Sequence, residues 1–596
     1  MNEKLKRLWA ADSGSVGDSH CVIGSWRILR DFLSEDGIAL ARNDLTKERL
    51  VDGFRLITLT VLVLVTLLAQ RFADSWLKRI EDAGARLAQR KGAVIFGAAL
   101  VSMVARLLLL PLAPVPIPNV HDEFSYLLAA DTFAHGRLTN PPHQLWVFLD
   151  TFHVLQHPTY ASIYPPAQGM ALALGQLLGS PWIGVLLSVA VMCAAVAWAL
   201  QGWLPARWAL LGTLIALLRV DLMSYWVDSY WGGAVAATGG ALVIGALPRI
   251  LRRRSLRDSL LLGVGAAILA NSRPVEGLLF CLPVAVVLAL RLFSGGGTGF
   301  RLKVASALLP AILVLGCAAA FMGYYNWRVT GNALLFPHVL VSRIYGGFPV
   351  FVWQRAKPAL TYANPQLTGY VDWARSEFLE RSWARVNLTK CHLGWSFFLG
   401  PALSIPLLTL PWLIFDRRVR FLMIQALWCG IWLLLVIYFQ PHYAAPLTAG
   451  VFAIVAQAIR HLRQWKLRSY RVGIFASRLI VVLLVARVLL PGTEIVNAPR
   501  RGWNLSRAQI AGQLQATPQK HLVMVRYAPD HDVSHEWVYN AAEIDAAKIV
   551  WAREIPGRDL KPLLDYYRDR RVWLVDADAA SPQLKPYPSD AAQSSH

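Results

Sequence analysis

Apolar segments long enough to cross a membrane, or nearly so, recur along most of this chain and alternate with short polar loops. They lie at residues 54–69, 93–112, 182–200, 209–218, 232–247, 260–290, 304–321, 395–415, 421–439, 444–459 and 474–490. The stretch 260–290 is interrupted at 271–277. A helix rises 1.5 Å per residue, so about 20 apolar residues cross the hydrocarbon core of a bilayer. The pattern predicts a polytopic α-helical membrane protein with about 11–12 transmembrane helices.

Composition agrees with this prediction. The 596 residues are 55% hydrophobic and only 16% charged, whereas soluble proteins average about 25% charged residues. The net charge of +22 is carried by short Arg- and Lys-rich runs between the apolar segments, as in the cytoplasmic loops of membrane proteins. Nucleic-acid binding is therefore the weaker interpretation of the basic charge, and no nucleic-acid partner is expected.

The basic runs also indicate the sidedness of the helices. Residues 249–257, 291–303, 416–420 and 460–471 are basic and are placed in the cytoplasm. Two cytoplasmic ends require an even number of crossings, so 260–290 is predicted to be a helical hairpin with its tip outside. The same count places two long loops outside, 113–181 and 323–393. The first loop is expected to hold two juxtamembrane helices, at 124–136 and 165–179. The segment 165–179 is placed in the loop because it is short for a span.

The sequence suggests four parts. Residues 1–53 form a polar, amphipathic extension whose side of the membrane stays open, and 54–92 add one membrane helix and a basic loop. Residues 93–491 form the main transmembrane domain. Residues 492–596 are expected outside the membrane as a small soluble α/β domain, with β-like runs at 521–527, 548–553 and 571–576 and a helix at 559–567.

Polar clusters gather at the predicted outer face. Carboxylates there could act as general bases, and arginines could hold a phosphate through forked hydrogen bonds. The candidate residues are His121, Asp122, Glu123, Tyr164, Asp228, Arg273, Glu276, Arg328, His442 and Tyr443.

Structural alternatives accompany several of these candidates. Acidic residues such as Asp122 and Glu123 also suit the first turn of a helix, and Arg273 with Glu276 could simply be an i,i+3 ion pair. His143, His153 and His157 share the first outer loop and are a weak signal for a metal. No metal site or cofactor is predicted, and dependence on a divalent metal stays open.

Four short motifs, in this order along the chain, resemble the GT-C superfamily of membrane glycosyltransferases. The similarity is to family 39-like members of the aminoarabinose- and mannosyl-transferase type, and it covers about residues 93–460. The motifs are Asp122-Glu123-Phe124-Ser125-Tyr126, Tyr164-Pro165-Pro166, Ser272-Arg273-Pro274-Val275-Glu276-Gly277 and His442-Tyr443-Ala444-Ala445-Pro446.

The resemblance implies a polyprenyl-phosphate sugar donor and an acidic residue near the reacting centre. It makes Asp122 the first candidate for the catalytic or acceptor-positioning residue and Glu123 the second. Aminoarabinose-type members carry Lys where this chain has Arg273, which keeps the positive charge.

Together these features predict a glycosyltransferase of the bacterial inner membrane, multi-pass, with its C-terminal domain extracytoplasmic. It would move a sugar from a polyprenyl-phosphate donor to an acceptor, which could be a glycan, a lipid or a protein, among membrane lipids. The alternatives are a transporter or flippase of a lipid-linked or small polar substrate, a polysaccharide polymerase or ligase, and a non-catalytic scaffold. Transporters usually place ionisable residues near the bilayer midplane and often show repeated halves, and neither feature is evident in this sequence.

Overall fold

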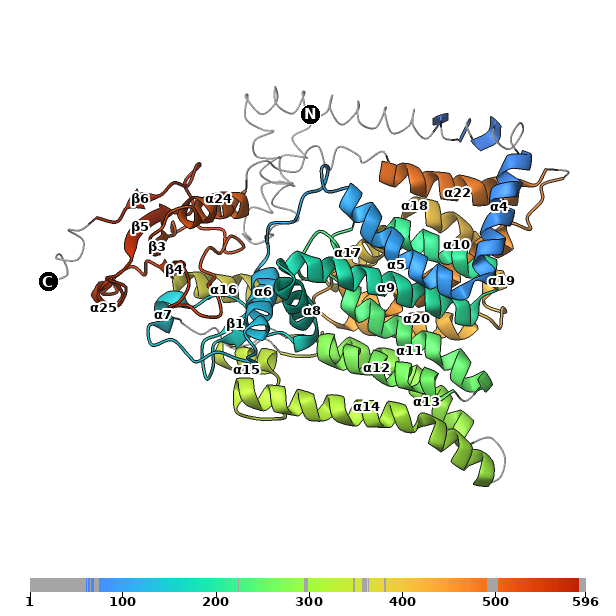
Figure 1. Ribbon diagram of the computed structural model, residues 1–596, viewed down its shortest axis with the longest axis horizontal. Coiled ribbons are helices and arrows are strands. Elements are labelled where there is room, and N and C mark those ends of the chain that lie inside the picture. Colours follow the sequence, from blue (N-terminus) through green and yellow to red (C-terminus); the bar gives the residue numbers. More distant parts are fainter. Residues whose placement is uncertain are drawn as a thin grey trace, which may run out of the picture.

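The chain folds as a polytopic helical membrane protein with a small α/β domain at one end of the helical bundle (Figure 1). The computed structural model describes residues 74–588 except 223, 254, 294–297, 347–348, 356–361, 363, 380–381, 469 and 490–501, together with a few positions between 60 and 68. The predicted extension 1–53 and most of the predicted span 54–69 lie outside the described residues.

Within the described residues, six helices are long and apolar enough to cross a membrane, or seven if one bent pair counts as a span. The predicted count of 11–12 also included shorter helices, such as α12 with 17 residues and α20 with 16. The bundle consists of α5 (Lys91–Leu108), α9 (Pro181–Trp203), α10 (Ala206–Ala216), η1 (Leu217–Asp221), α11 (Ala234–Arg253), α12 (Leu256–Ser272), α13 (Pro274–Phe293), α14 (Thr298–Thr330), α20 (Arg420–Leu435), η3 (Pro441–Leu447), α21 (Thr448–Leu462) and α22 (Val472–Leu489).

The predicted hairpin is present as α12 and α13, which are separated by Arg273 at the tip. Pro274 opens α13, where a missing backbone N–H costs nothing because the first turn of a helix has no intrahelical acceptor for it. The hairpin therefore places Arg273 and Glu276 at one end of the bundle.

Two helices differ from the prediction. α14 continues through Tyr325 and Arg328 to Thr330 and ends before Gly331, which has a φ of 79°, so these residues lie on a helix rather than in the predicted loop. The predicted span 395–415 is broken between α17 (Trp383–Phe398) and the segments α18 (Gly400–Ser404), η2 (Ile405–Thr409) and α19 (Leu410–Leu413), with a bend of 92°. Gly400 has a φ of 61°, which ends the first helix at little steric cost.

The first outer loop folds against the end of the bundle. It contains α6 (His121–Ala134), α7 (Trp146–Leu149), the short strands β1 (Val154–Leu155) and β2 (Ala161–Ser162), and α8 (Pro166–Leu177). Both predicted loop helices are thus present as α6 and α8. α15 (Pro337–Ile344) and α16 (Pro365–Leu379) come from the second outer loop, and in Figure 1 they lie at the same end.

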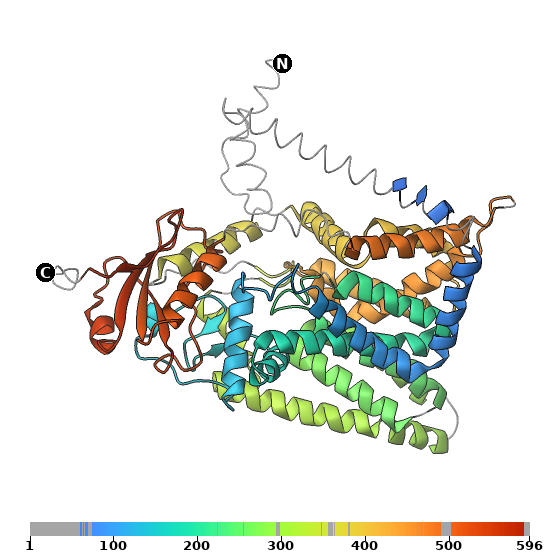
Figure 2. The ribbon, with the colours of Figure 1, turned by 45° about the horizontal axis from the view of Figure 1, so that its top comes forward.

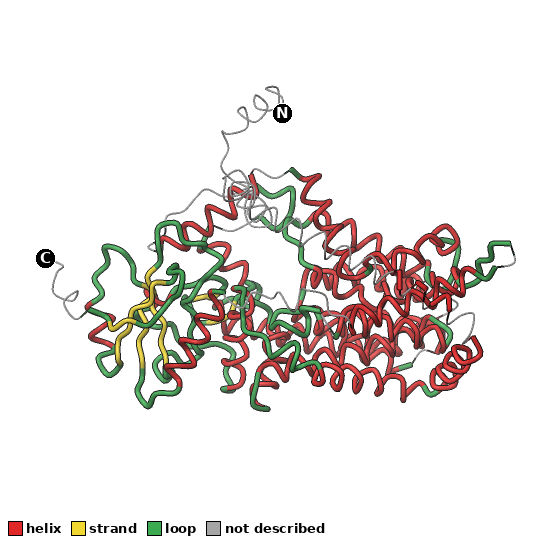
Figure 3. Tube along the Cα trace, turned by 90° about the horizontal axis from the view of Figure 1, so that it is seen from above, coloured by secondary structure: helices red, strands yellow, loops and turns green. Residues whose placement is uncertain are grey.

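The C-terminal domain contains the three predicted strands, β3 (His521–Arg526), β4 (Ile549–Arg553) and β5 (Arg571–Asp576). They pair in parallel in the order β4-β3-β5, and the short β6 (Lys585–Pro586) joins β5 antiparallel. The helices α24 (Trp503–Gln515) and α25 (Lys561–Tyr566) accompany the sheet. Figure 3 shows these strands, in yellow, at the opposite end from most of the helices, and Figure 2 shows the domain beside α6.

Small residues bring the site-bearing segments together. A Cβ added at Gly240 of α11 would lie 2.1 Å from the carbonyl oxygen of Pro446, so η3 can approach α11 only where a side chain is absent. Gly239 and Gly265 permit a similar approach of α11 and α12. This packing places η3, with His442 and Tyr443, beside the tip of the α12–α13 hairpin.

Candidate active site

Glu123 fixes the start of α6. Its carboxylate accepts hydrogen bonds from the backbone N–H groups of Asn119 (2.7 Å), Val120 (3.2 Å) and Tyr230 (2.9 Å). The side chain is buried, and burial raises the pKa of Glu123 against the opposing effect of these donors. Glu123 therefore joins α6 to the loop before α11, which leaves little of its carboxylate for a substrate.

Asp122, the neighbouring residue, keeps a partly exposed carboxylate, with 26% of its side chain accessible. The hydroxyl of Tyr164 donates a hydrogen bond to Asp122 Oδ1. His153 Nδ1 lies 2.9 Å from the same hydroxyl, and His153 Nε2 lies 3.1 Å from the hydroxyl of Tyr370 on α16. Tyr164 gives its proton to Asp122, so His153 must donate to the Tyr164 hydroxyl through Nδ1.

A neutral His153 ring would carry its proton on Nδ1 and accept from the Tyr370 hydroxyl through Nε2. Burial lowers the pKa of His153, which agrees with a neutral ring. Burial raises the pKa of the Tyr164 hydroxyl, which remains a donor. The chain Tyr370–His153–Tyr164–Asp122 thus fixes the orientation of the Asp122 carboxylate.

Arg273 and Tyr443 form the facing wall. The Arg273 guanidinium lies 4.3 Å from the centre of the Tyr443 ring and 3.9 Å from Glu276 Oε1. Tyr443 interacts electrostatically with Arg273, Glu276 and Asp122, and Tyr126 of α6 interacts with the same three groups. The acidic residue of α6 and the cation of the hairpin therefore border one space, with Tyr126 and Tyr443 between them.

His442 lies beside this wall. Its Nδ1 is 2.9 Å from the hydroxyl of Tyr225, and its backbone N–H donates to the same hydroxyl at 3.0 Å. Its ring contacts Trp231 and Tyr443 at 4.9 and 5.0 Å. The buried ring supports the position of Tyr443.

Three sequence candidates lie elsewhere or are already engaged. Asp228 pairs with the fully buried Arg106 of α5 at 2.5 Å. Arg328 is exposed on α14 and donates to the hydroxyl of Tyr324, so it is not part of the group around Asp122. His121 is buried with its Nδ1 2.9 Å from the hydroxyl of Tyr539 in the C-terminal domain, and burial lowers its pKa to about 3.

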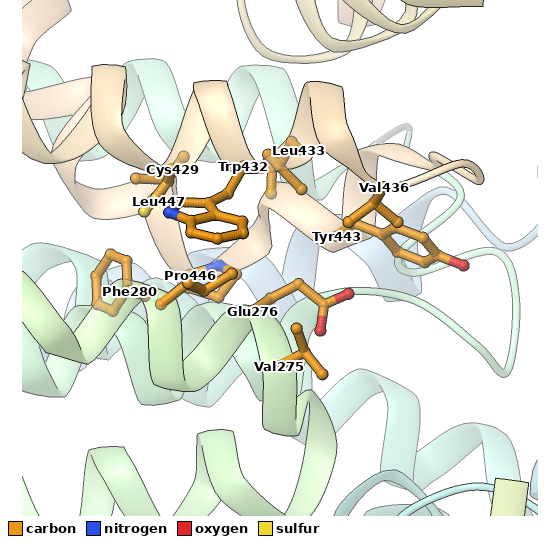
Figure 4. Close-up of a pocket in the computed structure, with 12 residues that line it drawn as sticks. Val275, Glu276, Phe280, Cys429, Trp432, Leu433, Val436, Tyr443, Pro446 and Leu447 are labelled. Atoms are coloured by element: carbon orange, nitrogen blue, oxygen red, sulfur yellow. The ribbon is translucent and has the colours of Figure 1, made fainter. Parts of the chain in front are cut away.

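An apolar groove opens from the Arg273 side of the site between α13, α20 and η3 (Figure 4). Glu276 and Tyr443 lie at one end of it, while Phe280, Cys429 and Leu447 lie at the other. The groove is narrow, with a cavity volume of about 20 Å³. Its walls suit a hydrocarbon chain, and its polar end adjoins Arg273.

The candidate list from the sequence did not include Tyr126, His153 or Tyr370, although Tyr126 stands in the first motif and His153 was considered only as a metal ligand. Tyr126 follows Asp122 by four residues, so helical spacing could have placed both on one face of α6. His153 and Tyr370 carried no comparable signal, because their proximity depends on how the two outer loops fold. Within the described part of the chain, no group of three or more His, Cys, Asp or Glu residues could hold a metal ion.

No protein-family model and no curated protein sequence matches this chain. Among solved structures, it is similar to ArnT from Cupriavidus metallidurans in the apo state (15% identity, TM-score 0.45, 80% of this chain and 93% of that chain covered). ArnT from the same organism bound to undecaprenyl phosphate matches at 15% identity and TM-score 0.44, covering 81% and 92%. The oligosaccharyltransferase of Archaeoglobus fulgidus tethered with an acceptor peptide matches at 12% identity and TM-score 0.42, covering 73% and 61%.

ArnT and the oligosaccharyltransferase are both GT-C superfamily members. With TM-scores below 0.5, these likenesses support no inference about this chain's activity.

Proposed function

We propose that this protein is a membrane glycosyltransferase that moves a sugar from a polyprenyl-phosphate donor to an acceptor. The observation that carries the proposal is that Asp122 and Arg273 both interact with Tyr126 and Tyr443, at the polar end of an apolar groove. A carboxylate base, a phosphate-binding cation and an apolar groove suit such a transfer.

In this reaction the Asp122 carboxylate takes the proton of the acceptor hydroxyl. The acceptor oxygen forms a bond to the anomeric carbon, while the bond from that carbon to the phosphate oxygen breaks. Polyprenyl phosphate leaves with the bonding electron pair, and Arg273 stabilises its negative charge. Attack on the face opposite the leaving group inverts the configuration of the sugar.

The remaining site residues have supporting roles. Tyr164 orients the Asp122 carboxylate, and Glu123 holds the first turn of α6 in place. Tyr443 and His442 position the guanidinium of Arg273. We assign the site to the extracytoplasmic side of a bacterial inner membrane, with residues 492–596 outside, because every strongly basic loop falls at the other end of the helices.

The test compares the lipids of a strain that lacks this protein with those of complemented strains. The deletion strain should accumulate a polyprenyl-phosphate sugar, because the donor is no longer consumed. Wild-type protein should clear the accumulated lipid, and Asp122→Asn should not, because an amide cannot accept the acceptor's proton at neutral pH. Immunoblots of the membranes confirm equal amounts of each protein.

Asp530→Asn is the matched control. It makes the same chemical change at an exposed residue of the C-terminal domain and should clear the lipid as the wild type does. Clearance by Asp122→Asn at the wild-type rate would reject Asp122 as the base. A deletion strain without any accumulating lipid-linked sugar would reject the glycosyltransferase proposal.

A further inference from the structure

A second cavity, of about 740 Å³, lies at the end of the bundle remote from Asp122. α9 and α11 end there, α21 ends at the same level, and the segment between α19 and α20 closes it. The Gln201 side chain donates to the carbonyl of Lys91, so this end of α9 lies beside the start of α5, a full helix length from the loop that bears Asp122. The lining residues are Trp203, Arg252, Trp412, Phe415, Asp416, Arg417, Arg418 and His461.

The cavity carries an excess of positive charge. Of its eight lining residues, three are arginines and one is an acid. That acid, Asp416, is already engaged: its Oδ2 accepts from Gln457 (2.5 Å) and lies 2.9 Å from His461 Nε2, and its Oδ1 accepts from the backbone N–H of Arg418 (2.9 Å). The Asp416 carboxylate thus accepts hydrogen bonds from Gln457 and from the backbone, and in the part of the chain that the structure describes it does not bond to the guanidinium groups of the lining arginines.

Further cations surround the lining. Arg460 of α21 interacts electrostatically with Arg418 and Arg207, which repel it, and with Asp416. Its Nη1 is buried and, among the described residues, has no hydrogen-bond partner. Several guanidinium groups are therefore held close together with one carboxylate among them. An anion with several acceptor oxygens would satisfy this arrangement.

The rim of the cavity faces an apolar environment. Phe415 is 81% exposed and Trp412 is 55% exposed, and both lie at the end of a helical bundle that spans the membrane. Aromatic side chains at this level are typical of the boundary between hydrocarbon and head groups. A ligand here would therefore have its acyl chains beside Trp412 and Phe415 and its charge at the arginines.

We propose that this cavity binds the phosphate head group of an anionic phospholipid in the leaflet opposite the Asp122 site. Arg417 and Arg418, both exposed, supply the forked donors for the phosphate oxygens, and Arg252 closes the cavity from the end of α11. Arg252 is itself anchored by a 2.7 Å hydrogen bond to the carbonyl of Gly202, which joins the ends of α9 and α11. Bound lipid would thus join three segments of the bundle at this end.

The experiment titrates the purified full-length protein in detergent with anionic phosphatidylglycerol and, separately, with zwitterionic phosphatidylcholine. Native mass spectrometry counts the bound lipids. Phosphatidylglycerol should bind at least about tenfold more tightly than phosphatidylcholine. The double variant Arg417→Gln, Arg418→Gln should weaken phosphatidylglycerol binding by about tenfold or more, because two charge-assisted contacts are lost. Arg417→Lys, Arg418→Lys should recover part of the binding because the charge returns.

The matched control is Arg420→Gln, Arg471→Gln, which removes two exposed arginines at the same end that do not line the cavity. It should leave binding within about twofold of wild type. Equal losses in the two double variants would overturn the proposal, because binding would then follow net charge alone. Equal binding of the two lipids, or saturation by inorganic phosphate without any binding of phosphatidylglycerol, would also overturn it. The result is independent of the activity assigned to Asp122.

Discussion

Asp228 is an acidic residue at the same end of the bundle as Asp122, and we expect that its loss destabilises the fold. Asp228→Ala removes the partner of Arg106, whose side chain is fully buried and whose Nη2 lies 2.5 Å from Asp228 Oδ1. The guanidinium keeps its 2.8 Å hydrogen bond to the carbonyl of Ala113 but loses its countercharge. The guanidinium would then be buried without a hydrogen-bonded carboxylate, although Asp221 still interacts with it electrostatically.

Removing one partner of a buried ion pair costs about 3–5 kcal/mol of unfolding free energy. Asp228 is 34% exposed, so water can reach this side of the pair and reduce the loss. The hydrogen bond to Ala113 also remains. We therefore expect the lower end of the range, about 3 kcal/mol. Arg106→Met combined with Asp228→Ala should recover most of this loss, because no unpaired charge is then buried.

The assay measures equilibrium unfolding in mixed micelles as the fraction of a denaturing detergent is increased. Tryptophan fluorescence monitors the unfolding. Trp182 is a local reporter, since its ring lies 5.2 Å from the Arg106 guanidinium and its indole N–H donates to Val227. Asp530→Asn, at an exposed residue of the C-terminal domain, is the control and should unfold within about 0.5 kcal/mol of wild type. The reasoning is refuted if Asp228→Ala unfolds like wild type, or if the double variant is less stable than the single one.

Three further predictions concern the site and the loop that supports it. Tyr164→Phe removes the hydrogen-bond donor to Asp122 and should slow clearance of the lipid-linked sugar by about 10–100-fold, since a hydrogen bond to a charged group contributes about 1.5–3 kcal/mol. An unchanged clearance rate would contradict this role of Tyr164. Arg273→Gln should raise the donor concentration needed for half-maximal rate by at least about tenfold, whereas Arg328→Gln should not change it. If a donor titration gave equal effects for the two variants, Arg273 would not be the residue that binds the phosphate. Burial raises the pKa of Asp150 from 3.8 to about 7, so the folded protein holds this proton more tightly than the unfolded chain does. The unfolding free energy should therefore fall by up to about 4 kcal/mol as the pH rises from 4 to 7. Asp150→Asn should remove that slope in unfolding measured at several pH values, and an unchanged slope would assign it to another group.

Local patterns determined much of the architecture. The hairpin α12–α13 could be predicted because basic runs at both ends allow only an even number of crossings. The strands β3, β4 and β5 could be predicted because short β-branched and apolar runs are bounded by polar residues. The break between α17 and α18 was not predicted, because residues 395–415 contain no charged residue and form one largely apolar run. Gly400 and Pro401 mark the position of the break. Helix α24 was not predicted.

By itself, the sequence determined that this is a multi-pass membrane protein with its polar clusters at one end of the helices, because hydropathy and charge are properties of the chain alone. Only the tertiary structure decided which partners the neighbouring carboxylates of Asp122, Glu123 and Asp228 engage. Glu123 is engaged by the backbone of Tyr230, and Asp228 is engaged by Arg106, both distant in sequence. Asp122 has a partly exposed carboxylate held by Tyr164, and it interacts with Tyr126 as Arg273 does. No local pattern contains that information, because packing decides which partners occupy or orient a side chain.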